Sequence, residues 1–130
     1  MSTQAQNVYM KTQATTAHPG ELTLMLYNGC LKFMKQSMIN IERREFEAKN
    51  TNIQRAIDIV EELQITLNME YELSANLFSL YAFIKETLME ANIGMNKDHI
   101  QECINLLIEL RDTWVQALKQ VKSGLQVNTL

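Results

Sequence analysis

The chain has 130 residues, with one proline, four glycines and a net charge of -3 at pH 7. This length suits one domain that buries a sizeable core without disulfides or metals. Scarce proline and glycine, beside abundant Leu, Ile, Met, Glu, Lys and Gln, predict an all-helical protein. Charges of both signs are interspersed, so the sequence offers no basic patch for nucleic acid and no polybasic stretch for anionic membranes.

The sequence shows no targeting or membrane signal. Its first residues lack the charged, apolar and small-residue pattern of a secretory signal, and no apolar run reaches the ~18 residues of a membrane helix. We therefore expect a cytoplasmic protein without membrane insertion. Cys30 and Cys103 fall inside expected helices, where a cysteine usually behaves as a small buried hydrophobe, and a disulfide is not expected in that compartment.

The chain begins with a polar segment, residues 1–17, whose apolar cluster is centred on Tyr9. Its composition predicts a mobile arm. Pro19 is favoured at the first helical position, which makes His18 the N-cap and places Glu21 at the positive end of the helix dipole. We expect the first helix over about 19–44.

Three more helices are predicted by apolar residues that recur at spacings of three and four. After a break at 46–49, we expect them over about 50–68, 72–93 and 97–123, with a short tail at 125–130. Gly94 is expected to close the third helix in the left-handed conformation. Short connections make consecutive helices antiparallel neighbours, so residues 18–124 are predicted to form an all-α, up-down-up-down four-helix bundle.

The first helix is apolar on two opposite faces. One face is a core seam led by Leu24 and Leu31, and the other lies about 200° away at 100° per residue. This second face comprises Leu22, Leu26, Gly29 and Phe33. Two interpretations are open: the bundle or the arm covers this face, or the face forms a groove for an amphipathic helix of a partner, which Gly29 would allow to approach closely.

Catalytic and metal-binding patterns have no support. Neither His18 nor His99 follows a glutamate by three residues, as a carboxylate-bridged metal site in a bundle requires. The sequence also lacks a phosphate-binding glycine loop and a zinc-spaced cysteine pair. We expect no enzymatic activity, cofactor or metal. Two alternatives remain: a histidine phosphotransfer bundle that uses His99 or His18, and an adaptor that binds helices of another client.

The amino-acid sequence at the start of the first helix resembles that of a known family. Residues 16–22, Thr-Ala-His-Pro-Gly-Glu-Leu, run into Leu-Met-Leu-Tyr-Asn-Gly at 24–29, and this order is similar to the opening of the flagellar secretion chaperone family FliS. Further similar stretches follow in order at 55–63, 66–68, 77–81, 88–92 and 110–114, so the resemblance spans about residues 8–118. The departures are mild: the family tends to have Ser or Thr at His18, an acidic residue at Asn28, and Asp at Asn68 and Ala82.

The resemblance implies a non-enzymatic cytoplasmic chaperone with an antiparallel helical bundle. Such a protein binds the disordered C-terminal segment of flagellin, prevents its premature polymerisation and supports its delivery to the flagellar type III export gate. The client segment folds into helices on the chaperone, whose N-terminal arm competes for part of the surface. The candidate contacts are Tyr9, Leu22, Leu26, Gly29, Phe33 and Ile59, the last of which lies off the seam of its helix.

Overall fold

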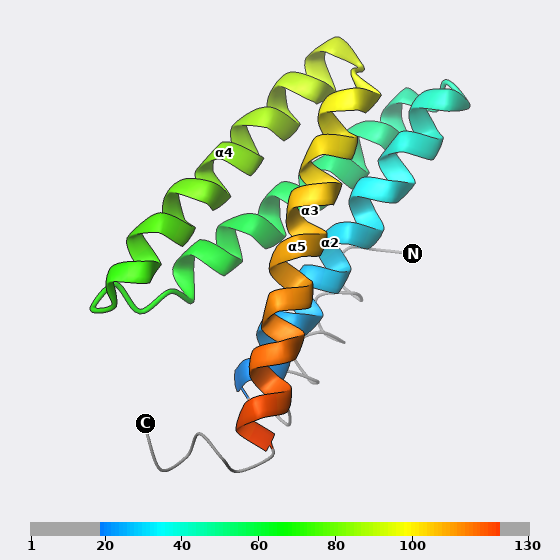
Figure 1. The fold of residues 1–130 in the computed structure, drawn as a ribbon. Helices are drawn as coiled ribbons and strands as arrows, with labels where there is room; N and C mark the ends of the chain where they lie inside the picture. The colour runs from blue at the N-terminus through cyan, green and yellow to red at the C-terminus, as the bar shows by residue number, and fades with distance from the viewer. Residues whose placement is uncertain (1–18, 123–130) are drawn as a thin grey trace.

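The computed structural model describes residues 19–122, which form four helices. These are α2 (Pro19–Glu42), α3 (Phe46–Ile65), α4 (Glu72–Gly94) and α5 (Lys97–Lys122). Helix α2 packs against α3 and α5, and α4 packs against the same two helices, so α2 and α4 occupy opposite corners of the bundle (Figure 1). The predicted all-α antiparallel bundle is confirmed. The expected arm (1–17), the His18 cap and the tail (125–130) lie outside the described residues.

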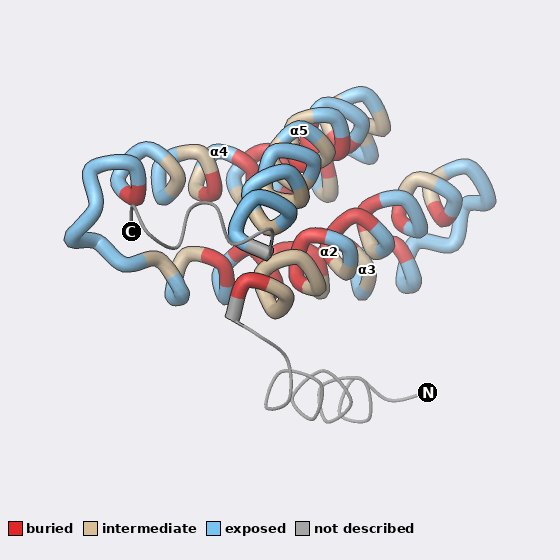
Figure 2. The backbone as a smooth tube through the Cα atoms, turned by 60° about the horizontal axis from the view of Figure 1, so that its bottom comes forward, coloured by how far each residue is buried: buried red, intermediate tan, exposed pale blue. Residues whose placement is uncertain are grey.

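The core lies between the four helices, where their buried positions face one another (Figure 2). Helix α2 contributes Leu31 from the expected seam and Leu26 from the opposite face, because its two neighbours lie on different sides of it. Side chains that are completely enclosed come from all four helices: Met34, Ile53, Val60, Ile84, Leu88, Ile100 and Leu107.

The bundle is splayed at one end. The α3–α4 connection, at the lower left of Figure 1, lies away from the start of α2 and the end of α5. Helix α5 stays attached to α2 at this end, because the indole Nε1–H of Trp114 donates to the backbone oxygen of Gly20 at 2.7 Å. The two helix pairs α2/α5 and α3/α4 therefore separate towards that end.

Helix α3 begins at Phe46, so the predicted break at 46–49 is wrong, and α2 ends at Glu42. The chain reverses over three residues because Arg44 takes a left-handed conformation, with φ of 60°. The N–H of Glu45 then donates to the oxygen of Asn40 at 2.8 Å, which satisfies a carbonyl at the end of α2. Because the left-handed position is occupied by arginine and not by glycine, the sequence did not reveal this turn.

The α4–α5 turn corrects the role predicted for Gly94. Gly94 is the last helical residue of α4, and Met95 takes the left-handed conformation with φ of 51°. The N–H groups of Met95 and Asn96 both donate to the oxygen of Ala91. The side-chain oxygen of Asn96 accepts from the N–H of Asp98 at 3.0 Å and so caps α5.

Two buried polar side chains donate hydrogen bonds to backbone oxygens near the helix ends. Lys49 of α3 is 4% exposed, and its Nζ donates to the oxygen of Asn92 at 2.9 Å, in the last turn of α4. The ammonium there meets the negative end of the α4 dipole. Ser74 donates through its hydroxyl to the oxygen of Asn68 at 2.6 Å and fixes the connection before α4. The first contact ties the start of α3 to the end of α4, and the second holds the connection between these helices against the start of α4.

Candidate partner-binding surface

The second apolar face of α2 lies against α3. Leu26 is 4% exposed and Ile59 of α3 is 8% exposed, so both side chains belong to the core. A Cβ added to Gly29 would lie 3.4 Å from Cδ1 of Ile59, which is an ordinary packing distance. Helix α3 therefore covers the middle of this face, and Ile59 packs beside position 29 of α2.

The ends of the same face are partly open. Leu22 and Phe33 are half-buried and pack against the core. The guanidinium Cζ of Arg55 lies 5.6 Å from the centre of the Phe33 ring, and Nζ of Lys32 lies 6.0 Å from it. Cations over an aromatic face are attracted by its quadrupole. We call Leu22, Leu26, Gly29, Phe33 and Ile59 the α2–α3 seam.

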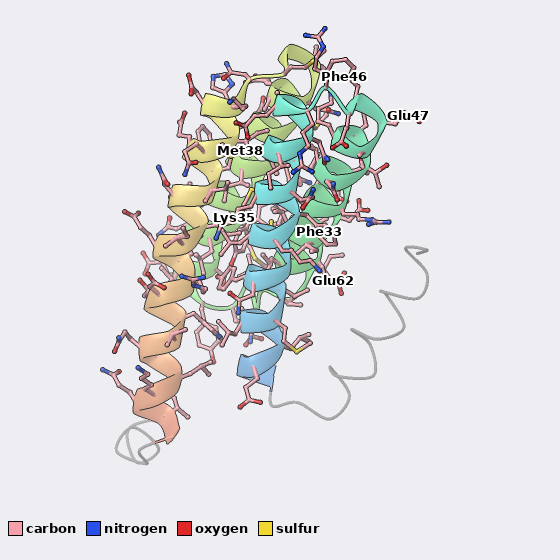
Figure 3. The ribbon with its side chains drawn as sticks, turned by 90° about the vertical axis from the view of Figure 1, so that its right-hand side faces the viewer. Phe33, Lys35, Met38, Phe46, Glu47 and Glu62 are labelled. Atoms are coloured by element: carbon pink, nitrogen blue, oxygen red, sulfur yellow. The ribbon has the colours of Figure 1, made fainter. Side chains whose placement is uncertain are left out.

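A further partly exposed aromatic residue, Phe46, lies at the start of α3. Figure 3 shows Phe46 near the α2–α3 turn, Phe33 on the flank of α2 that faces α3, and Met38 on the flank of α2 towards α5. Phe46 is 37% exposed and lies in an open hollow lined by Glu45, Phe46, Glu47 and Ala48. The guanidinium Cζ of Arg44 lies 5.7 Å from the Phe46 ring centre. Phe46 was not among the residues predicted to bind a partner, although the sequence shows it as an aromatic residue within the expected break between helices.

The outer side of α4 also exposes large apolar side chains that were not among the predicted partner contacts. Phe78, Met89 and Ile93 are 43%, 55% and 86% exposed. The sequence shows these residues outside the apolar stripe that α4 needs for the core, and this excess of apolar residues could have indicated an exposed surface.

The centre of the bundle holds neutral hydrogen-bonding groups. Burial raises the pKa of the Cys103 thiol to about 12, and it also raises the pKa of the Cys30 thiol. The Cys30 thiol donates to the oxygen of Ala56 at 3.6 Å. Both thiols are therefore protonated at neutral pH and behave as the small buried hydrophobes that the sequence predicted.

The remaining residues singled out in the sequence are His99, Tyr9 and His18. His99 is half-buried in the first turn of α5, where its backbone N–H donates to the side-chain oxygen of Asn96 at 3.3 Å. Tyr9 and His18 lie outside the described residues. Between residues 19 and 122, no cluster of three or more His, Cys, Asp or Glu side chains is arranged to hold a metal ion. None of the helices in that range is both long and apolar enough to cross a membrane.

Comparisons with known proteins agree on one family. The family model described as flagellar protein FliS matches residues 1–121. The flagellar secretion chaperone FliS of Bacillus subtilis is 41% identical over 111 residues, which are 85% of this chain and 84% of that protein. The corresponding chaperone of Campylobacter jejuni is 33% identical, over 85% of this chain and 88% of its own length. FliSB of Pseudomonas aeruginosa, also a flagellar secretion chaperone, is 32% identical over 85% of this chain and 90% of its own length.

A solved structure supports the fold independently. A crystal structure of a flagellar chaperone from bacteria superimposes with a TM-score of 0.75, covers 90% of this chain and 97% of its own, and is 23% identical in sequence. Because only 23% of the residues are identical, this structural similarity is evidence for the fold alone. Together with the sequence matches over nearly the whole length, it leads to one conclusion: the chain belongs to the FliS family of flagellar secretion chaperones.

Proposed function

We propose that this protein acts in the cytoplasm, binds the disordered C-terminal segment of flagellin, prevents its premature polymerisation and supports its transfer to the flagellar type III export gate. The family membership supports the chaperone role, and the α2–α3 seam supports the kind of client. The seam is the observation that carries the proposal, because partly open Leu22 and Phe33 flank an apolar floor of Leu26 and Ile59. Such spacing along a helix pair suits the apolar face of an amphipathic helix.

The energetics of binding indicate a large contact area. Complete burial of a Leu or Phe side chain contributes ~1.5 to 3 kcal/mol, and Leu22 and Phe33 are already half-buried. Folding of a disordered segment on binding costs ~2 to 5 kcal/mol or more. These two anchors alone therefore barely offset the ordering cost. Tight binding requires either further contacts outside the seam or a separation of α2 from α3 that opens Leu26 and Ile59 to the client.

Tyr9 belongs to the same proposal as a competitor for the client surface. It stands in an apolar cluster of an otherwise polar segment. Deletion of residues 1–17 should raise the affinity for the flagellin segment if the arm occupies the seam. An unchanged affinity would remove Tyr9 and the arm from the proposal without affecting the other contacts.

The experiment that tests the proposal is co-expression with flagellin. Phe33→Glu places a charge at a half-buried position of the seam and should abolish co-purification of flagellin, while circular dichroism still reports a folded bundle. Gln36→Glu is the matched control, because Gln36 is exposed on the same helix and the charge change is the same. Undiminished co-purification of flagellin with folded Phe33→Glu would contradict binding at the seam. Capture of flagellin by neither protein would contradict the proposed client.

A further inference from the structure

Helix α4 carries a second apolar stripe that faces solvent. Phe78, Ala82, Met89 and Ile93 fall within about 60° of one another at 100° per residue, and we call them the outer α4 face. Its three large side chains are 43%, 55% and 86% exposed. The buried stripe of α4, which includes Tyr81, Ile84 and Leu88, already supplies its contribution to the core. The outer α4 face is therefore not needed for packing within the described bundle.

The outer α4 face lies on the flank of α4 next to α3. Nζ of Lys85 is 3.4 Å from the carboxylate Oε2 of Glu61, and Nε2 of Gln64 donates to the backbone oxygen of Phe78 at 3.3 Å. Ile65, which follows Gln64 at the end of α3, is 75% exposed. The end of α3 and the start of α4 lie together at the end of the bundle that is away from the start of α2 (Figure 1).

The surroundings of the outer α4 face are acidic. Residues 46–94, which include α3 and α4, carry eight acidic and three basic side chains, a net charge of -5 compared with -3 for the whole chain. All three basic groups are engaged: Lys49 is buried against the oxygen of Asn92, Lys85 pairs with Glu61, and the guanidinium of Arg55 lies over the Phe33 ring. Glu86 and Glu90 lie on α4 itself and are exposed. An apolar strip results, with the exposed carboxylates of Glu86 and Glu90 along one edge and the ion pair of Lys85 with Glu61 along the edge next to α3.

The apolar strip and the acidic residues beside it indicate which kind of partner can bind the outer α4 face. A second copy docking through the same face would bring two acidic edges together, and an anionic lipid surface would be repelled by them. A helix with an apolar stripe flanked by Lys or Arg matches both the strip and its acidic edge. We propose that the outer α4 face is a second docking surface, which binds a basic amphipathic helix of a protein partner while the α2–α3 seam serves the flagellin segment.

The proposal is tested with the full chain and a designed probe. The probe is a fluorescein-labelled amphipathic peptide of about 20 residues, with leucines on one face and flanking lysines, and a matched peptide carries glutamates in place of the lysines. Fluorescence anisotropy should show that the lysine peptide binds about tenfold or more tightly than the glutamate peptide. Added salt should weaken the lysine complex, because exposed charges are screened.

Three variants locate the binding. Met89→Asp should weaken the lysine peptide by about tenfold or more, since it places a charge in the apolar strip. Phe83→Asp is the matched control: Phe83 is 47% exposed on the same helix, but its position is roughly 110° from the centre of the outer α4 face. Phe83→Asp and Phe33→Glu should both change the affinity by less than about twofold. Phe33→Glu separates this proposal from flagellin binding at the seam.

The contrary results are equally specific. The inference is wrong if the lysine peptide does not bind, if Phe33→Glu or Phe83→Asp weakens it as much as Met89→Asp does, or if the glutamate peptide binds equally well. Sedimentation equilibrium and anionic vesicle flotation cover the other occupants. A dimer or a vesicle complex that is lost in Met89→Asp would assign the face to a second copy or to lipid and would also overturn the proposal.

Discussion

The hydroxyl oxygens of Tyr27 on α2 and Tyr81 on α4 lie 2.6 Å apart in the middle of the bundle, with both side chains 3% exposed or less. These helices occupy opposite corners and do not otherwise pack together. Burial raises the pKa of both phenols, so both remain protonated and one hydroxyl donates to the other. The hydrogen bond therefore joins the two corners that helix packing leaves apart.

Removal of both hydroxyls should cost less stability than the sum of the two single removals. Tyr81→Phe leaves the buried hydroxyl of Tyr27 without its partner, and we expect a loss of about 1 to 3 kcal/mol in the free energy of unfolding. The double variant Tyr27→Phe with Tyr81→Phe should lose less than the sum of the single variants. Urea denaturation of the four proteins measures the coupling. Strictly additive losses would contradict a bond between these side chains.

Alkaline pH should weaken the fold through its buried thiols. Burial raises the pKa of Cys103 to about 12 and raises that of Cys30, so the folded state retains protons that an unfolded thiol releases above pH 9. The unfolded state then binds fewer protons, and the free energy of unfolding should fall as the pH rises above 9. Urea denaturation between pH 8 and pH 11 measures this slope.

Cys103→Ala serves as the control for the alkaline slope. It removes one buried thiol and should reduce the dependence of stability on pH, although the cavity that it leaves lowers stability at every pH. An equal slope in the variant would show that the thiol of Cys103 does not contribute. Iodoacetamide should alkylate neither cysteine of the folded protein at pH 7.5, because both are buried and protonated.

The α4–α5 turn should tolerate substitutions that raise stability. Gly94 is helical, and a Cβ added to it meets no atom within 4 Å, so Gly94→Ala should stabilise the protein by roughly 0.5 to 1 kcal/mol. Met95 has a φ of 51°, and Met95→Gly should relieve left-handed strain of about 1 kcal/mol, partly offset by the greater freedom of glycine in the unfolded chain. Urea denaturation of the two variants gives both changes. A destabilising Gly94→Ala would show that the turn needs glycine there.

The buried Lys49 should contribute more to stability than Lys85, which is partly exposed and forms an ion pair. Lys49→Met keeps an apolar stem but removes the donor to the oxygen of Asn92, and we expect a loss of about 1 to 3 kcal/mol. Lys85→Met is the matched control, because its ion pair with the half-exposed Glu61 carboxylate is solvated and should contribute less than about 1 kcal/mol. Thermal denaturation ranks the two variants. An equal or larger loss in Lys85→Met would contradict the capping role of Lys49.

Periodicity predicted the helices because four stretches each carry a buried stripe, as Ile53 and Val60 do in α3. It misplaced the turns because Arg44 and Met95 adopt conformations that sequence analysis assigns to glycine. It also found two apolar faces on α2 without deciding which was covered. Leu26 and Ile59 are buried by the approach of α2 to α3, and such tertiary packing is not encoded in the spacing of either helix alone.

Amide hydrogen exchange, with and without the flagellin C-terminal segment, tests binding at the α2–α3 seam most directly. The segment should slow exchange in α2 around Leu22 to Phe33 and in α3 around Ile59, and Phe33→Glu should remove this protection while the folded bundle remains. Protection confined to α4 and α5, or protection of α2 and α3 that persists in Phe33→Glu, would contradict the assignment of the α2–α3 seam to flagellin.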